Sequence, residues 1–143
     1  MNMITIEING TEPKGQPRPR VYRNGGRIIT HSPHNDYYYA IQTEAIKARL
    51  TRHGGLPEGV AVEITADICF AVPHSLSRKE KAARLAARYH TQTPDTDNLA
   101  KAILDAIVSA GLIADDRQVY RLSISKEWAE QNKTIITIEW EEK

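Results

Sequence analysis

The sequence predicts an α+β fold, with a mixed or antiparallel β-sheet and helices packed on one face of it. Segments of alternating polarity predict strands, and helical patterns lie between them without a regular alternation of strand and helix. The chain has 143 residues, of which 41% are hydrophobic and 26% are charged. This length and composition suit one domain with its own core, so we expect a single domain over residues 1–143.

The N-terminal part is predicted to contain a strand, an arm and a hairpin. Residues 3–8 alternate in polarity, as a half-buried strand does. Residues 13–20 contain three prolines, which fix φ and remove backbone donors, so this segment is predicted to be an ordered arm without helix. Residues 21–23 and 27–30 flank Asn24-Gly25-Gly26, which predicts a hairpin.

A helix, a strand and a second helix are predicted in the middle of the chain. Residues 32–51 begin with a Ser-Pro pair, which favours the first turn of a helix, and then repeat apolar residues at helical spacing. Residues 60–70 alternate and predict a long strand. Ser77 and Glu80 form a capping box at the start of a polar helix over residues 77–88, which is predicted to be exposed.

The C-terminal part is predicted to hold one helix and two strands. The helix covers residues 97–109 and ends before Gly111, at the usual position for a glycine after a helix. Residues 119–126 and 133–141 then predict the last two strands.

The N-terminus and the cysteine content indicate the compartment. The single cysteine, Cys69, excludes an intramolecular disulfide and a zinc site built from cysteines. The first residues lack the basic and apolar regions of a signal peptide, and no apolar stretch is long enough to span a membrane. We therefore expect a cytoplasmic protein with no membrane partner.

Charge is distributed unevenly along the chain. Residues 1–53 contain eight Lys and Arg against four Asp and Glu, whereas residues 94–143 contain six against ten. An enzyme that acts on phosphodiesters needs one part that attracts phosphate and another that holds a divalent cation. The composition alone is also compatible with ordinary surface charge.

Five carboxylates lie between residues 95 and 116, on Asp95, Asp97, Asp105, Asp115 and Asp116. Asp95 and Asp97 are two residues apart in an extended lead-in to a helix, so they project to the same side and can chelate a cation. The structural alternative is that Asp97, or the threonine before it, caps the helix. For the adjacent pair Asp115 and Asp116, only one side chain is predicted to face Asp95 and Asp97, and the residues alone leave open which.

The helix carries a second chemical group on the same face. Asp97, Lys101 and Asp105 follow at intervals of four, which is also the spacing of a simple ion-pair ladder. Asp105 lies about 12 Å along the helix from Asp97, too far to share one cation with it. Lys101, one turn from Asp97, is placed to bring an ammonium group beside a phosphate.

Together these segments resemble the RusA family of Holliday junction resolvases. The matching residues occur in the family's order and spacing: Pro94-Asp95-Thr96-Asp97-Asn98-Leu99-Ala100-Lys101, Leu104-Asp105-Ala106-Ile107 and Asp115-Asp116-Arg117-Gln118-Val119. The arm Gly15-Gln16-Pro17-Arg18-Pro19-Arg20-Val21 also resembles the N-terminal segment of many members.

The resemblance implies a homodimeric endodeoxyribonuclease, bacterial or phage-encoded, that makes paired nicks in four-way DNA junctions. It implies Mg²⁺ as the cofactor, with Mn²⁺ able to replace it, and places the metal ligands on Asp95, Asp97 and Asp116. It places the essential lysine on Lys101. One departure is Thr93, where members often carry a basic residue, and His90 is the nearby candidate for that phosphate contact.

We expect DNA contacts from the basic residues of the arm and hairpin, because guanidinium groups suit phosphate geometry: Lys14, Arg18, Arg20, Arg23 and Arg27. A second basic run, over residues 78–88, is explained most simply as a solvated helix face. Two other functions compete with junction resolution. One is a nuclease for other branched DNA that uses the same site. The other is a DNA-binding protein without catalysis, whose acidic residues serve as caps and ion pairs.

Overall fold

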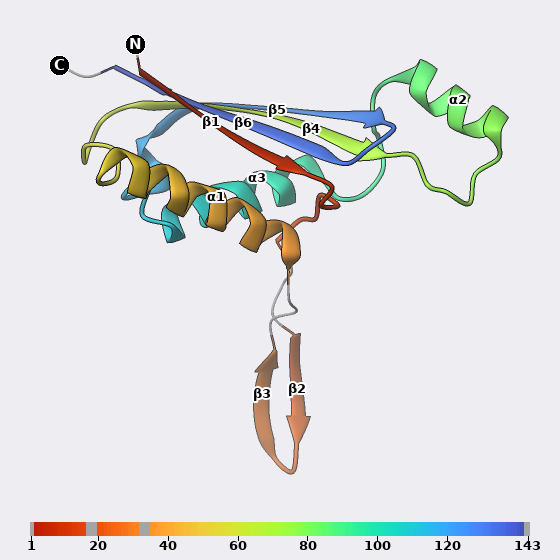
Figure 1. Ribbon diagram of the computed structural model, residues 1–143. Coiled ribbons are helices and arrows are strands. Elements are labelled where there is room, and N and C mark those ends of the chain that lie inside the picture. The colour runs from red at the N-terminus through yellow and green to blue at the C-terminus, as the bar shows by residue number, and fades with distance from the viewer. Residues whose placement is uncertain (1, 17–19, 32–34, 142–143) are drawn as a thin grey trace.

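The computed structural model describes residues 2–16, 20–31 and 35–141, and for residues 20–24 and 28–31 it describes the backbone. Its elements in chain order are β1 (Asn2–Asn9), β2 (Arg20–Asn24), β3 (Arg27–His31), α1 (Asp36–Arg52), β4 (Val62–Ala71), α2 (Arg78–Ala87), α3 (Thr96–Ser109), the short 3₁₀ turn η1 (Asp116–Gln118), β5 (Val119–Ala129) and β6 (Lys133–Trp140) (Figure 1). No helix in these ranges is both long and apolar enough to cross a membrane.

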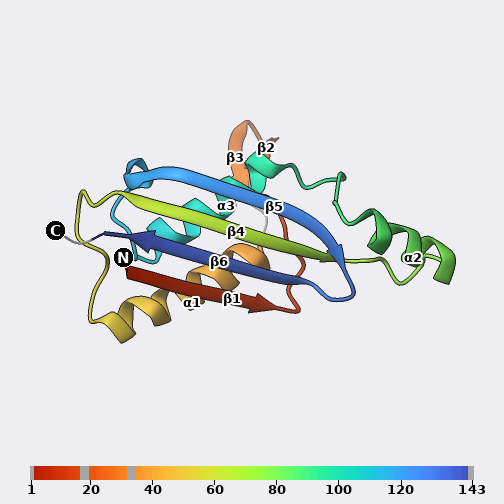
Figure 2. The ribbon, with the colours of Figure 1, turned by 90° about the horizontal axis from the view of Figure 1, so that it is seen from above.

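The main sheet has four strands in the order β1-β6-β4-β5 (Figure 2). β6 is antiparallel to both of its neighbours, β1 and β4, whereas β4 and β5 are parallel. A parallel pair needs a long crossover connection, which the chain provides here through α2 and α3. The predicted α+β fold with a mixed sheet is therefore confirmed.

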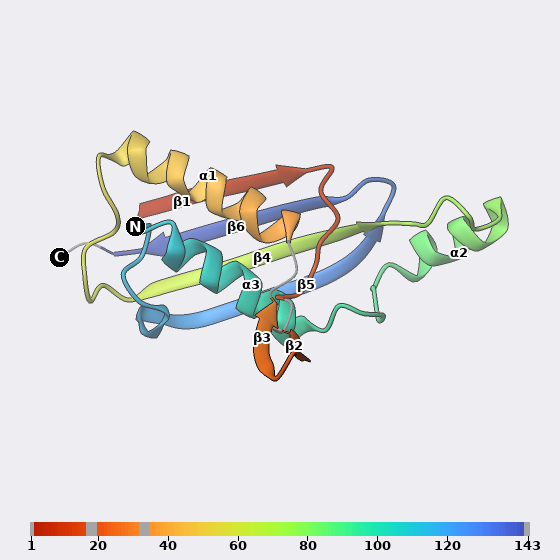
Figure 3. The same ribbon diagram turned by 90° about the horizontal axis from the view of Figure 1, so that it is seen from below.

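The two faces of the sheet differ in character. α1 and α3 lie on one face, and no helix of the described chain covers the other (Figures 1 and 3). Along β4 the residues Val62, Ile64, Ala66, Ile68 and Phe70 are buried against the helices. The residues between them, among them Glu63 and Asp67, point to the uncovered face. There Glu139 of β6 lies directly opposite Glu63 in the strand register.

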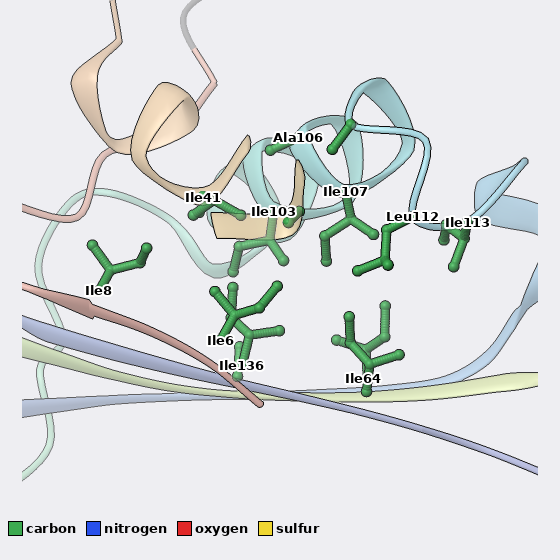
Figure 4. Packing of buried hydrophobic residues seen from close by; sticks show 14 of the residues in the cluster. Ile6, Ile8, Ile41, Ile64, Ile103, Ala106, Ile107, Leu112, Ile113 and Ile136 are labelled. Carbon is green, nitrogen blue, oxygen red and sulfur yellow. The ribbon is translucent and has the colours of Figure 1, made fainter. Parts of the chain in front are cut away.

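The core lies between the sheet and the two helices α1 and α3. Leu99, Ile103 and Ile107 recur at helical spacing and are fully buried. In Figure 4, Ile103 and Ile107 point toward Ile64 and Ile136 of the sheet. Since burying one such side chain contributes about 1.5–3 kcal/mol, this stripe fixes the position of α3 on the sheet.

α1 begins later than the sequence predicts. The helix starts at Asp36, and the side chain of Asn35 accepts a hydrogen bond from the backbone N–H of Tyr38 at 3.1 Å. The predicted start at Ser32-Pro33 is therefore wrong, and residues 32–34 themselves lie outside the described ranges. Asparagine is as good a capping residue as serine, so local signals alone did not decide between the two positions.

α2 is confirmed as an exposed helix. Ser77 caps it and accepts a hydrogen bond from the backbone N–H of Glu80 at 3.1 Å, and none of its residues is buried. The helix projects from one end of the sheet (Figure 2).

The predicted hairpin is also confirmed. β2 and β3 pair only with each other in the described sheets, and the hairpin projects from the helical side of the molecule, away from the main sheet (Figure 1). Gly25 and Gly26 form its turn with φ values of 60° and 81°. A tight hairpin turn with two loop residues needs positive φ at both of them. Glycine adopts positive φ at little cost, which explains the two glycines.

Candidate functional site

Asp95 occupies the N-cap position of α3 without performing the usual capping role. Its backbone is extended, with φ −67° and ψ 151°, and its carbonyl oxygen accepts a hydrogen bond from the N–H of Leu99 at 3.1 Å. Its side chain makes no capping hydrogen bond and is exposed. A cap residue normally satisfies a free N–H of the first turn with its side chain. The carboxylate of Asp95 is thus free for another role, and the capping alternative for Asp97 is wrong because Asp95 holds that position.

Asp97 and Lys101 lie one turn apart on the exposed side of α3. The side chain of Asp97 accepts one hydrogen bond, from the backbone N–H of Asn98 at 3.0 Å. The Nζ of Lys101 lies 3.9 Å from the carboxylate of Asp105, and 64% of the Lys101 side chain is exposed. An exposed ion pair at this distance is weak. The ammonium group of Lys101 therefore remains available to an anion that binds beside Asp97.

Asp115 and Asp116 have different roles in the turn that follows α3. Asp115 caps η1: its side chain accepts a hydrogen bond from the N–H of Arg117 at 2.8 Å and forms an ion pair with the Arg117 guanidinium at 3.1 Å. The N–H of Arg117, and then its guanidinium, lower the pKa of Asp115. Gln118 completes the capping box by accepting a hydrogen bond from the N–H of Asp115. Asp116 is exposed and does not take part in this box.

The carboxylates fall into two groups at opposite ends of α3. Asp95 and Asp97 lie at its N-terminus, whereas Asp116 follows its C-terminus. A helix of 14 residues is about 21 Å long. Among the described residues, no three His, Cys, Asp or Glu side chains come together in a way that could hold a metal ion. Within the part of the chain that the structure describes, the three predicted ligands therefore do not form such a group.

The second group lines a hollow of about 410 Å³ beside the C-terminal half of α3. Its acidic members are Asp105, Asp115 and Asp116, and Gln16 and Tyr38 form part of the opposite wall. The side-chain oxygen of Gln16 is buried without a hydrogen-bond partner. The arm thus reaches from the start of α3 to the acidic hollow.

The chain segments before and after the hairpin are both held near the N-terminus of α3 by hydrogen bonds. The N–H of Gln16 donates to the carbonyl oxygen of Asn98 at 3.2 Å, and the side chain of Asn35 donates to the carbonyl oxygen of Gly15 at 3.0 Å. A Cβ at Gly15 would lie 2.7 Å from the Cβ of Asn98, so this close approach requires glycine. The basic hairpin therefore leaves the body of the protein beside the first turn of α3, which carries Asp97 (Figure 3).

A family model described as endodeoxyribonuclease RusA matches residues 10–139 of the 143. The chain belongs to the RusA endodeoxyribonuclease family. It is therefore an enzyme that acts on phosphodiester bonds of DNA, and its family acts on branched DNA junctions with divalent metal ions. No curated protein matches the sequence at a significant level.

The basic residues predicted to contact DNA in this RusA-family enzyme lie on the arm and hairpin. Lys14 and Arg27 are exposed. Arg20 and Arg23 belong to β2, whose backbone runs along the projecting hairpin, and Arg18 lies outside the described residues. Their contact with DNA stays a prediction.

His90 does not suit the phosphate contact expected of it in a RusA-family enzyme. Only 7% of the residue is exposed, its ring stacks on Phe70 with 3.8 Å between centroids, and Trp128 lies 4.4 Å away. Burial lowers the pKa of His90, and the neighbouring ammonium of Lys126 lowers it further. A buried neutral imidazole offers little attraction to a phosphate, so this expectation is wrong. The aromatic contacts come from residues 20 and 38 positions away, which local sequence patterns do not reveal.

Acid is expected to destabilise the enzyme through His90. Because the pKa of His90 is lower in the folded chain than its ordinary value of 6.5, the unfolded chain binds more protons. The free energy of unfolding that the neutral His90 contributes is present in full above pH 6.5. It is lost as the pH falls toward the pKa of His90 in the folded chain. Melting temperatures between pH 8 and about 5.5 should therefore fall less for His90→Phe, which retains the stacking, than for the wild type. The exposed His74 supplies the control, His74→Asn; equal slopes for His90→Phe and the wild type would contradict the prediction.

Proposed function

We propose that this enzyme resolves four-way (Holliday) DNA junctions by paired nicks, using one RusA-like domain over residues 1–143. The observation that carries the proposal is the pair Asp95 and Asp97, exposed and beside a basic hairpin, with Asp95 at a cap position that it does not use. Carboxylate oxygens are the ligands that Mg²⁺ prefers, and Mn²⁺ accepts the same donors. We assign the metal to Asp95, Asp97 and Asp116. When bound, it would supply an activated water and neutralise charge on the phosphoryl group.

Lys101 is assigned an electrostatic role in the cleavage step. Its ammonium group lies one helical turn from Asp97 and is held only weakly by Asp105. Charge that develops on the phosphoryl oxygens beside Asp97 would be stabilised by this positive group. Asp105 acts as a positioning residue for Lys101, and Asp115 maintains the turn that presents Asp116.

The site is proposed to be completed in a homodimer. Oxygen ligands bind Mg²⁺ at about 2.0–2.1 Å, and within the described part of one chain Asp95, Asp97 and Asp116 do not come together as a metal-binding group. A two-fold axis that sets the α3 helices of two copies antiparallel would bring Asp116 of the partner subunit to Asp95 and Asp97. It would form two equivalent sites, one for each of two opposed strands of a junction. The hairpin is a second reason to expect a partner subunit. An isolated two-stranded hairpin is at best marginally stable, so contact with another copy would stabilise it.

Substrate comparison tests the assignment to four-way junctions. The enzyme should nick a mobile four-way junction in two strands, with Mg²⁺ or Mn²⁺, faster than flaps or forks of the same sequence. Faster cleavage of flaps or forks would favour a nuclease for other branched DNA. A purified enzyme that binds junctions but never nicks them with either metal would favour a DNA-binding protein without catalysis.

Asp95→Ser should separate stability from activity. Serine is as good a helix cap as aspartate, and Asp95 makes no capping bond to lose, so the melting temperature should stay the same or rise. Metal-dependent nicking should be lost because a ligand is removed. Thermal unfolding and a nicking assay on the same preparation measure both quantities. Retained nicking would remove Asp95 from the metal site.

The basic hairpin should contribute to the salt dependence of DNA binding. Each phosphate contact removed from duplex DNA lowers the slope of log affinity against log salt by about 0.9. We expect Arg18→Ala and Arg20→Ala each to weaken junction binding and to flatten this slope. Lys47→Ala on α1, where the lysine is paired with Glu44, is the matched control and should change neither. Unchanged slopes for both arginine variants would exclude the arm from phosphate contact.

A further inference from the structure

Asp95 is one of the residues that line a groove of about 730 Å³, and the cleavage step proposed above makes no use of the rest of this groove. One wall is the segment between α2 and α3, and the other is the edge strand β5, along which this segment runs (Figure 3). Its volume lies in the range of pockets that hold small ligands, about 300–1,000 Å³. Besides Asp95, its lining includes several residues with hydroxyl or amide side chains: Thr91, Gln92, Thr93 and Ser125.

The wall is fixed to β5 by hydrogen bonds, so the groove is formed before any ligand binds. The N–H of Trp128 donates to the carbonyl oxygen of Arg88 at 2.7 Å, and the N–H of His90 donates to that of Lys126 at 3.0 Å. The ammonium of Lys126 donates to the carbonyl oxygen of Gln92 at 2.7 Å. A preformed groove binds a ligand without first losing the entropy of an ordered loop.

Tyr89 presents an aromatic ring at this groove. The residue is 61% exposed, although its backbone forms a bridge to Glu127 of β5 and is thus held in place. The guanidinium of Arg88 lies 5.3 Å from the centre of the Tyr89 ring and also pairs with Glu127 at 3.1 Å. An exposed aromatic ring on a fixed backbone beside a cation is a typical surface for stacking a nucleic-acid base.

We propose that this groove binds one nucleotide at the branch point of the junction, with its base stacked on Tyr89 and its phosphate directed toward Asp95 and its metal. The proposal deepens the function given above and rests on it. The hydroxyl groups of Thr91 and Thr93 can donate to phosphate and sugar oxygens, and the Asp95 carboxylate in the lining is one of those assigned to the metal. The groove thereby positions the scissile strand.

Fluorescence of 2-aminopurine tests this inference without cleavage. The probe is placed in turn at each nucleotide that flanks the branch point of a four-way junction, and the junctions are titrated with enzyme in the absence of metal. Stacking quenches the probe, so at least one position should be quenched by the wild type and by Tyr89→Phe. Tyr89→Leu should lose this quenching and bind the junction about 10-fold more weakly.

Tyr120→Leu is the matched control, because Tyr120 is equally exposed at 62% but lies at the opposite end of β5. It should behave as the wild type does, and melting temperatures of all variants verify that they fold. Quenching by Tyr89→Leu equal to that of the wild type, or quenching at no position, would overturn the inference. Because the titration needs no metal, it is independent of the proposed function, which fails separately if the wild type never nicks a junction.

Discussion

Asp97→Asn is expected to abolish nicking of a four-way junction while leaving junction binding intact. Asparagine keeps the size of the side chain but removes the negative charge that a divalent cation needs. A charged group that acts on the transition state contributes on the order of 10²–10³ in rate, so the nicking rate with Mg²⁺ should fall by at least about 100-fold. Binding, measured without metal, should stay within about 3-fold because the hairpin and its basic residues are unchanged.

The control for this variant is Glu130→Gln, which removes an exposed charge in the turn between β5 and β6. It should nick at the wild-type rate. If Asp97→Asn nicks as fast as the control, the metal site is not at the start of α3. If Asp97→Asn loses binding as well as nicking, Asp97 supports the fold or the DNA surface instead.

Heterodimers of two inactive variants are expected to regain activity. If each site combines Asp97 of one copy with the partner's Asp116, a dimer of one Asp97→Asn chain and one Asp116→Asn chain contains one site with both carboxylates intact. The other site then carries both substitutions. This heterodimer should nick one strand of the junction, whereas both parent homodimers should be inactive. Differently tagged chains, co-expressed and purified through both tags, allow the measurement.

Two further pairings make the result unambiguous. Asp95→Asn combined with Asp97→Asn should not regain activity, because both residues belong to the same half of the site. The double variant Asp97→Asn/Asp116→Asn combined with a wild-type chain should be inactive as well, because each composite site then lacks one ligand. If instead this last heterodimer nicks and the first does not, all three ligands act within one chain and the composite site is wrong.

Much of the fold could be predicted because its signals are local. β4 alternates over ten residues between one buried and one open face, and Ser77 caps α2 as its sequence predicts. The start of α1 could not be predicted, since Ser32-Pro33 and Asn35 both give capping signals and only tertiary contacts choose between them. The parallel pairing of β4 with β5 likewise depends on the crossover and not on any local pattern.

The candidate site could be predicted as a set of residues but not as an arrangement in space. The motif around Asp95, Asp97 and Lys101 lies on one short segment, so its residues remain together in the fold. Asp116 is separated from them by the whole of α3, and the sequence did not reveal that this helix holds the two groups apart. The groove beside Tyr89 was missed because its walls come from segments that are distant in sequence.

The carboxylates on the uncovered face of the sheet have a consequence for how DNA would approach the enzyme. If the hairpin binds DNA as proposed, Glu63, Asp67 and Glu139 would repel the polyanion from that side while the hairpin attracts it on the other. In a dimer joined through the helical sides, both repelling surfaces would lie on the outside of the assembly. Collisions with ordinary duplex DNA would then be unproductive over most of the surface, and encounters that lead to capture would be confined to the central zone between the two copies.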